Sequence, residues 1–247
     1  MIGAIVQARM GSTRLPGKVM MEGAGKPLLG HLLERLGYCK KLEKIIVATS
    51  TDGRDDVIDK FCNSHHVAVY RGSEHDVLDR YYQAARALEI TCIVRVTSDC
   101  PLIDPILIDE KISQFLNKLD DYDLITNRHP LTYPDGVDFD LIPLHGLDAA
   151  WRNATEAHQR EHVVPFFWES GMRVNNFEDP RRLFYSHRWT LDYIEDYELI
   201  RSIYLTLYKN NPKFTSEDIL KCLCANPELS RINAKYLPST SSHNQNE

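Results

Sequence analysis

Short runs of apolar, mostly β-branched residues alternate with longer amphipathic segments through the first half of this 247-residue chain. Runs such as Ile45-Ile-Val-Ala-Thr and Ile93-Val-Arg-Val-Thr are nearly continuous in their apolar character. Such strands belong in a parallel sheet that is covered on both faces, because a solvated face would require alternating polar residues. The pattern therefore predicts an α/β fold with a doubly wound, mostly parallel (mixed) sheet flanked by helices.

Eight elements are expected in this half of the chain, with strands and helices in alternation. The strands are predicted at residues 2–8, 44–50, 67–71 and 92–97, and the helices at 27–36, 52–63, 76–88 and 104–119. Ligands of doubly wound folds bind at the carboxyl ends of the strands. The loops after Ala8, Ser50 and Thr97 are therefore the places where a site is expected.

From about Asn127 the alternation is interrupted by a segment that contains two prolines and a glycine. We expect a single domain over residues 1–235 with an insertion at about 127–177. The polar residues 236–247 lack periodicity and predict a disordered tail. In this second half the predicted strands are 122–126, 137–142, 173–177 and 183–191, and the predicted helices are 144–155, 159–170, 195–208 and 216–224.

Composition excludes several classes of protein. A net charge of −6 argues against nucleic acid or an anionic membrane as a partner, because both require a basic surface. No stretch approaches the roughly 20 apolar residues that span a bilayer, and Arg9 comes too early for a signal peptide. Six scattered cysteines without a C-x-x-C pair predict reduced, mostly buried thiols. We therefore expect a cytoplasmic protein.

The loop after the first predicted strand holds three cations within ten residues: Arg9, Arg14 and Lys18. Guanidinium groups fork onto phosphate oxygens, and glycines such as Gly11 and Gly17 let backbone N–H groups approach an anion. The loop is therefore suited to a triphosphate. From these residues alone, a solvated loop whose cations have no specific partner remains an alternative.

A Walker A loop is excluded by spacing. That motif requires four residues between its glycines and a hydroxyl residue after its lysine. Here five residues separate Gly11 from Gly17, and Val19 follows Lys18. If the loop binds phosphates, it does so in another way.

The segment Gln7-Ala-Arg-Met-Gly-Ser-Thr-Arg-Leu-Pro-Gly-Lys18 resembles the signature loop of cytidylyltransferases that make CMP-activated acidic sugars. These include CMP-Kdo synthetases and acylneuraminate cytidylyltransferases, and the resemblance is closest to the spore coat polysaccharide biosynthesis protein F branch. It implies a nucleotide-diphospho-sugar transferase-like fold whose insertion serves the acceptor or dimerisation. The implied activity is Mg²⁺-dependent transfer of CMP from CTP to an acidic or related sugar for glycan biosynthesis, by a homodimer.

The same resemblance implies roles for particular residues. Arg14 and Lys18 would be catalytic residues that clamp the β and γ phosphates. Asp76 starts a predicted helix, so it could instead be a helix cap. The nucleotide-binding residues would be Gln7, Ala8, Arg9, Gly11, Ser12, Asp76 and Ser98.

Two aspartates in separate segments are candidates for Mg²⁺ ligands. Asp99 follows the strand at 92–97, and Asp192 lies in Arg188-Trp-Thr-Leu-Asp192. Taken alone, Asp99 reads as a turn or cap residue and Asp192 as the cap of the helix after it. The resemblance implies that both bind Mg²⁺, which is usually held by one or two carboxylates together with phosphate oxygens.

The acceptor candidates are less distinctive. The segment Arg160-Glu-His162 resembles the pattern of the same branch and implies an acceptor or dimer role, although an exposed amphipathic helix has the same residue types. The full set of acceptor candidates is Asp138, Arg160, Glu161, His162 and Arg188.

Two other classes compete with this interpretation. Asp138-Phe-Asp140 matches the D-x-D motif of metal-dependent glycosyltransferases, but in an alternating strand two outward carboxylates are ordinary. A nucleotide-sugar-dependent glycosyltransferase is therefore one alternative, and a non-catalytic nucleotide-binding protein of the same fold is another. His65-His66 has no further ligands nearby in the sequence, so we expect no metal site there.

Overall fold

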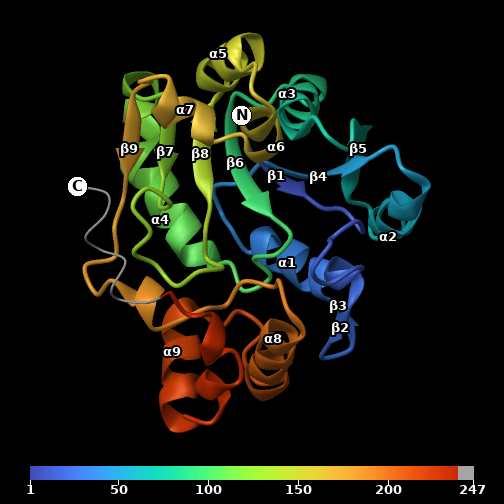
Figure 1. The fold of residues 1–247 in the computed structure, drawn as a ribbon, viewed down its shortest axis with the longest axis vertical. Coiled ribbons are helices and arrows are strands. Elements are labelled where there is room, and N and C mark those ends of the chain that lie inside the picture. The colour runs from blue at the N-terminus through green and yellow to red at the C-terminus, as the bar shows by residue number, and fades with distance from the viewer. Residues whose placement is uncertain (239–247) are drawn as a thin grey trace.

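Seven strands form one mixed sheet in the order β5-β4-β1-β6-β8-β7-β9 in the computed structural model, which describes residues 1–238 (Figure 1). β8 runs antiparallel to β6 and β7, and the other neighbours are parallel. The predicted α/β fold with a mostly parallel, mixed sheet is confirmed. The strands are β1 (Ile2–Gln7), β4 (Lys44–Ser50), β5 (Ala68–Gly72), β6 (Cys92–Thr97), β7 (Leu124–Thr126), β8 (Asp140–Pro143) and β9 (Val174–Asn176), beside a hairpin of β2 (Glu22–Gly23) and β3 (Lys26–Pro27).

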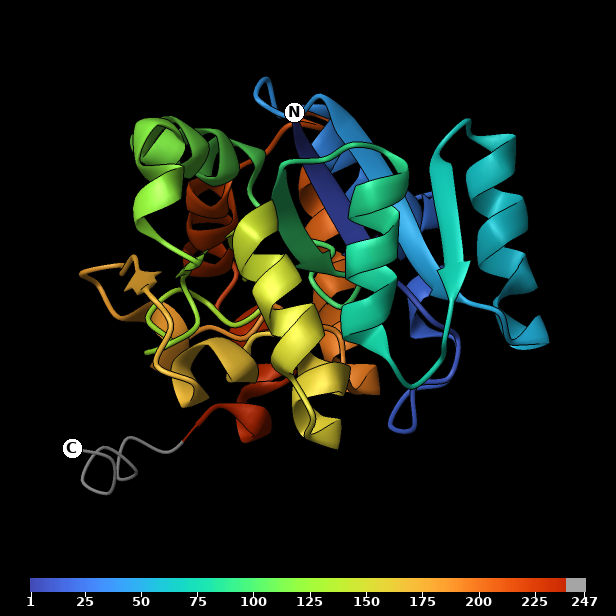
Figure 2. The same ribbon diagram turned by 90° about the horizontal axis from the view of Figure 1, so that it is seen from above.

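Helices cover both faces of the sheet because successive strand residues point to opposite sides. Ala4 and Val6 of β1 belong to one core and Ile5 to the other. Seen from above, α3 and α5 lie together on one face, while α4 lies on the other (Figure 2). One face carries α1 (Leu28–Gly37), α2 (Asp56–Ser64) and α4 (Pro105–Phe115); the other carries α3 (Val77–Ala87), α5 (Leu144–Asn153), α6 (Ala157–His162) and α7 (Pro165–Glu169).

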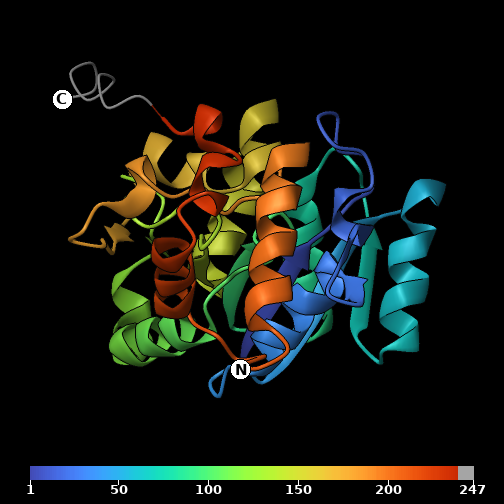
Figure 3. The same ribbon diagram turned by 90° about the horizontal axis from the view of Figure 1, so that it is seen from below.

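A third core joins α8 (Ile194–Leu207) and α9 (Ser216–Ala225) to the end of the molecule toward which the β6 arrow points (Figure 1). Figure 3 shows these two helices foremost when the molecule is viewed from below. Trp189, Tyr204 and Phe214 are at most 1% exposed in this core. Burial of such large aromatic side chains fixes the C-terminal segment near the carboxyl ends of the strands.

The parallel pairing of β1 with β6 has the greatest effect on the site. Gln7 is opposite Thr97, and the backbone N–H of Ser98 donates to the Gln7 carbonyl oxygen at 2.9 Å. The loops after the two strands therefore leave the sheet side by side, although about 90 residues separate them in the sequence.

Three predictions about the second half need correction. The strand predicted at 183–191 is wrong: Leu183–Tyr185 forms a 3₁₀ turn, and an isolated bridge between Arg188 and Asp135 is the only β pairing within this segment. The helix predicted at 159–170 is two short helices, because Val163 has φ +70° and Pro165 cannot donate a backbone hydrogen bond. The strand predicted from residue 137 begins at Asp140.

The ends of the chain and its thiols add two findings. Tyr236, where the predicted tail begins, lies in a 3₁₀ turn and stacks on Tyr193, whereas residues 239–247 of that tail lie outside the described residues. All six cysteines are free, and only Cys224 is exposed, as predicted. Within residues 1–238 no helix has the length and apolar character needed to cross a membrane.

Gly136 should be intolerant of any side chain. Its φ is +108°, and an added Cβ would lie 2.4 Å from both the Thr190 nitrogen and the Trp189 carbonyl carbon. We expect Gly136→Ala to lower the free energy of unfolding by more than about 2 kcal/mol. Denaturant unfolding measures this loss.

Gly37→Ala is the matched control. No atom lies within 4 Å of the added Cβ at the end of α1, so this change should be neutral or stabilise the helix by up to about 1 kcal/mol. Equal stability of the two variants would contradict the close approach of residues 136 and 189–190.

Candidate active site

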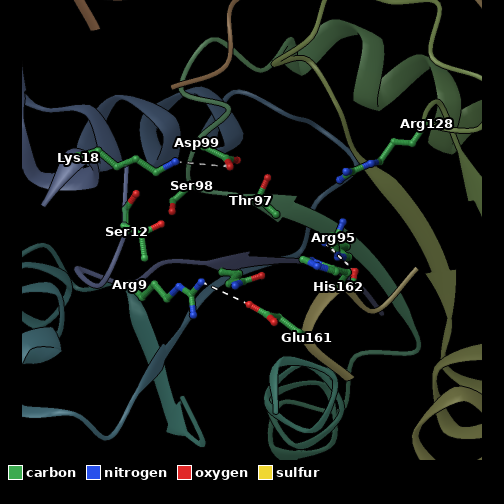
Figure 4. Close-up of a pocket in the computed structure, with 12 residues that line it drawn as sticks. Arg9, Ser12, Lys18, Arg95, Thr97, Ser98, Asp99, Arg128, Glu161 and His162 are labelled. Atoms are coloured by element: carbon green, nitrogen blue, oxygen red, sulfur yellow. Dashed lines mark hydrogen bonds and ion pairs between the residues drawn. The ribbon is translucent and has the colours of Figure 1, made fainter. Parts of the chain in front are cut away.

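An open pocket lies at the carboxyl ends of β1 and β6, where the fold predicts a ligand site (Figure 4). Its cavity volume is about 250 Å³. Its lining comes from four separate parts of the chain. The lining residues are Gln7, Arg9, Ser12, Thr13, Lys18, Arg95, Thr97, Ser98, Asp99, Arg128, Glu161 and His162.

The basic loop after β1 is shaped by its own backbone. Gly17 adopts φ +74°, and its N–H donates to the Met10 carbonyl oxygen at 3.0 Å. The Met10 N–H in turn donates to Asp55 Oδ1 at 2.7 Å, and Asp55 also accepts from Ser50 at the end of β4. The loop after Ser50, where a site was also expected, therefore supports the basic loop and does not line the pocket.

Lys18 lies between two aspartates from distant parts of the chain. Its ammonium donates to Asp192 Oδ1 at 2.9 Å and to the Leu191 carbonyl oxygen at 2.5 Å. Asp99 Oδ2 is 3.8 Å from the same nitrogen, and Figure 4 shows the two side chains pointing toward each other. The structure thus brings together the predicted phosphate-binding lysine and both predicted metal ligands.

Asp192 is surrounded by cations. Arg14 contacts the same carboxylate oxygen as Lys18, at 2.8 Å, and Arg188 donates to the other oxygen at 3.2 Å. Burial would raise the pKa of Asp192, but the hydrogen bond from Lys18 and the charges of Lys18, Arg14 and Arg188 together lower it. Asp192 therefore keeps its negative charge inside the site.

The alternative role of Asp192 as a helix cap belongs instead to Asp196. The buried Asp196 carboxylate accepts from the backbone N–H groups of Asp192 and Tyr193, at 3.0 Å each, and from the side chain of Asn233. It also accepts two hydrogen bonds from Arg188. Asp196 thus accepts the hydrogen bonds of the backbone N–H groups just before α8. The Asp192 carboxylate is therefore free to face Lys18.

Asp76 and Arg160 do not line the pocket. Asp76 Oδ1 accepts from the Asp79 N–H at the start of α3, so the helix-cap alternative holds for this residue. Its other oxygen pairs with Arg160 at 2.7 Å, and Arg160 also donates to the carbonyl oxygens of Trp151 and Ala154. These contacts join the start of α3 and the end of α5 to α6, and the nucleotide and acceptor roles of the two residues stay predictions.

The remaining predicted residues divide by position. Glu161 and His162 line the pocket, and Glu161 lies 3.6 Å from the Arg9 guanidinium. Ala8 is 1% exposed beneath the basic loop, and Gly11 lies beside Arg54 and Glu74, away from the lining. The residues that line the pocket directly are Gln7, Ser12, Ser98 and Asp99. Asp192 is outside this lining and contacts Lys18, Arg14 and Arg188.

The prediction of outward carboxylates in Asp138-Phe-Asp140 is wrong. Asp140 is fully buried and accepts from Arg95 Nη1 at 2.7 Å and from Thr126 Oγ1 at 2.6 Å. Asp138 is 7% exposed, and its burial raises its pKa to about 7 against the opposing charge of Arg128. Residues 1–238 contain no group of three or more His, Cys, Asp or Glu side chains that could hold a metal ion.

The sequence interpretation missed three charged residues. Arg95 and Arg128 line the pocket, and Asp135 accepts from Arg188 at 2.7 Å. Burial raises the pKa of Asp135 to about 6; the Arg188 charge opposes this, and the nearby Asp99 and Asp192 charges add to it. Arg128 and Asp135 belong to the proline-containing segment, whose only signal in the sequence was irregularity.

Asp140 should be important for stability and not for metal binding. Asp140→Asn would leave the buried Arg95 guanidinium without its counter-charge, which costs about 3 kcal/mol or more of unfolding free energy. Thermal and denaturant unfolding check this. Asp148→Asn is the control, because its ion pair with Arg152 lies on the surface and asparagine can still accept from the Tyr82 hydroxyl, so stability should change little. Normal stability with loss of metal activation would instead support a D-x-D metal motif.

Comparison with known proteins places the chain among nucleotidyltransferases. A family model described as cytidylyltransferase matches residues 3–213. The chain is 33% identical over 232 residues to the spore coat polysaccharide biosynthesis protein SpsF of Bacillus subtilis, covering 91% of this chain and 94% of that protein. It is 39% identical over 116 residues to a 3-deoxy-manno-octulosonate cytidylyltransferase of Trichlorobacter lovleyi, covering 47% and 45% of the two chains.

Among solved structures, the fold is similar to that of a cytidylyltransferase from Leptospira borgpetersenii. The TM-score is 0.87 at 33% sequence identity, and the alignment covers 92% of this chain and 95% of the other. The matched residues 3–213 also contain the basic loop, Asp99 and Asp192.

Proposed function

Because the chain belongs to the cytidylyltransferase family, we propose that it transfers CMP from CTP to an acidic or related sugar and releases pyrophosphate. The observation that carries this proposal is the position of Lys18, within 4 Å of both Asp99 and Asp192 at one end of an open pocket. Cations that would bind a triphosphate and carboxylates that would bind a metal thus lie together where two parallel strands end.

The reaction forms a bond between an acceptor oxygen and the α-phosphorus and breaks the bond from that phosphorus to the bridging oxygen of pyrophosphate. Such a step needs alignment of the reacting atoms and stabilisation of negative charge. Arg9 and Lys18 face the pocket, and Arg14 reaches Asp192 beside it. These cations would bind the triphosphate and stabilise the leaving pyrophosphate, so no covalent enzyme intermediate is needed.

Lys18 and Arg14 would change partners when the triphosphate binds. Both contact Asp192 Oδ1 in the structure. Phosphate oxygens compete with that carboxylate for the two cations, which would free Asp192 for another ligand. Arg188 stays bound to Asp196 and Asp135, so it would continue to hold the Asp192 segment in place.

Asp99 and Asp192 are the residues that would hold Mg²⁺. They pass a simple test of fit, because the Lys18 ammonium already places one positive charge within 4 Å of both carboxylates. Two carboxylates that face phosphate oxygens are a usual Mg²⁺ site. Magnesium would supply neutralisation of the triphosphate charge.

The relatives suggest the pathway. SpsF is named for spore coat polysaccharide biosynthesis and the Trichlorobacter relative for an octulosonate sugar. By analogy we propose a role in glycan biosynthesis in the cytoplasm, as a homodimer. The glycosyltransferase alternative is weakened because both carboxylates of its motif are buried, and a non-catalytic protein would not need the whole set of Arg14, Lys18, Asp99 and Asp192.

The proposed activity is tested by pyrophosphate release. The purified protein is incubated with Mg²⁺, with each nucleoside triphosphate in turn and with a panel of acidic and neutral sugars. We expect release with CTP and at least one acidic sugar, and abolition by EDTA that added Mg²⁺ reverses. The proposed function would be excluded if none of the triphosphates gave pyrophosphate release, or if the protein consumed a sugar nucleotide instead of a triphosphate.

Asp99→Asn should reduce kcat by about 100-fold or more, because it removes a charge aimed at the reacting phosphates. The Asp99 side chain is 33% exposed, so the melting temperature should change little. Binding of Mn²⁺ in the presence of CTP, followed by electron paramagnetic resonance, should weaken in parallel.

Asp121→Asn serves as the control, because this aspartate is exposed in the 3₁₀ turn Leu116–Asp121 and does not line the pocket. It should leave rate, metal binding and stability unchanged. Full activity of Asp99→Asn would show that the metal assignment is incorrect.

A further inference from the structure

Arg128 is a cation of the pocket whose side chain has no hydrogen-bond or ion-pair partner among residues 1–238. Arg9 pairs with Glu161, Lys18 with Asp192 and Arg95 with Asp140. The Arg128 guanidinium, by contrast, has no hydrogen bond or ion pair within residues 1–238, and Figure 4 shows it directed toward the pocket interior without a dashed contact. A guanidinium that lacks hydrogen-bond acceptors in a partly desolvated site is a strong binding group for an anion.

The backbone around Arg128 is firmly held. The Arg128 N–H donates to Thr126 Oγ1 at 3.1 Å, and the His129 N–H donates to Asn176 Oδ1 at 2.9 Å. The buried Asn127 side chain donates to the Val137 carbonyl oxygen and accepts from the Phe139 N–H. Because these contacts fix the segment, little conformational entropy remains to be lost in its backbone when a ligand binds.

Nearby carboxylates maintain the charge of Arg128 without neutralising it by contact. Burial would lower the pKa of this guanidinium, but the negative charges of Asp138 and Asp140 outweigh it and raise the pKa. Asp140 is occupied by Arg95 and Thr126, and no hydrogen bond joins either carboxylate to Arg128. The donors of Arg128 therefore remain available to a ligand while its charge is secured.

Arg128 and Lys18 stand on opposite sides of the pocket. In Figure 4, Ser98, Asp99 and Thr97 lie between them. If the triphosphate binds beside Lys18 and the basic loop, as proposed above, the space from Asp99 toward Arg128 is left for the acceptor. An acceptor that presents its nucleophilic oxygen near Asp99 would extend its other substituents toward the Arg128 guanidinium.

We propose that Arg128 determines acceptor specificity by binding an anionic group of the sugar, a carboxylate or a phosphate, through forked hydrogen bonds. This inference rests on the proposed cytidylyl transfer. Either anion matches the planar guanidinium, which presents parallel N–H donors to two oxygens. A neutral sugar would leave those donors unpaired, so Arg128 selects against it.

Arg128→Gln and Arg128→Lys test the assignment in steady-state assays with CTP. For the anionic acceptor, Arg128→Gln should raise KM about 10- to 100-fold, which is the cost of losing a charged hydrogen bond. The KM for CTP, and CTP affinity by calorimetry, should stay within about twofold of the wild-type values because the triphosphate lies at the other end. Arg128→Lys should recover part of the loss, because it restores the charge but not the fork.

Acceptor analogues identify the anion. A sugar acid is compared with its methyl ester, and a sugar phosphate with the dephosphorylated sugar. The wild type should prefer the charged member of one pair, and Arg128→Gln should reduce that preference about 10-fold or more. The pair that responds distinguishes a carboxylate from a phosphate.

Arg182→Gln is the matched control, because this arginine is 50% exposed and its nearest carboxylate, on Glu178, is 4.0 Å away. It should leave all constants unchanged, and melting curves show whether each variant is folded. An unchanged acceptor KM in folded Arg128→Gln, or a weakened affinity for CTP, would overturn the role of Arg128 while cytidylyl transfer stands. Absence of pyrophosphate release from the wild type with every acceptor would instead remove the transferase assignment and this inference with it.

Discussion

The parallel pairing of β1 with β6 is the constraint on which the site depends. Because Gln7 and Thr97 end these strands at the same level, the basic loop and the Asp99 loop leave the sheet together. The third core then brings the C-terminal segment to the same edge, since burial of Trp189 and Leu191 fixes the backbone on either side of Thr190. Hydrophobic burial thereby sets the position of Asp192, and Lys18 joins the three segments by contacts that need no metal.

The charge network explains how these groups coexist without a ligand. Asp192 is surrounded by Arg14, Lys18 and Arg188. Asp196 forms an ion pair with Arg188 and accepts hydrogen bonds from the backbone N–H groups just before α8. Each charge is paired, so the free protein avoids the cost of unsatisfied groups. A ligand that binds here must exchange partners with residues of the site, which favours highly charged ligands such as triphosphates over neutral ones.

The sequence predicts best where the structure is most regular. The continuous apolar strands identify the parallel half of the sheet, and the basic loop and Asp99 follow from their places after strands. The strand predicted at 183–191 was wrong because Trp189 and Leu191 are buried in the third core without strand pairing. An apolar pattern indicates burial and does not by itself indicate backbone pairing. Alternation likewise could not reveal that Asp140 faces inward toward Arg95, because that contact is between residues 45 positions apart.

The inserted segment has a physical role that its irregular sequence conceals. Asp138 and Asp140 are buried, and each lies near an arginine of the pocket wall. Asp140 accepts a hydrogen bond from Arg95, whereas neither carboxylate hydrogen-bonds to Arg128. The same pair of carboxylates thus lies beside one guanidinium that is ion-paired and one whose donors remain available. The difference requires that the backbone keep Arg128 out of hydrogen-bonding range of Asp138. The side chains of Asn127 and Asn176 hold the backbone of this segment by hydrogen bonds. The chain thus builds an anion receptor from a loop by fixing its main chain and leaving one side chain unpaired.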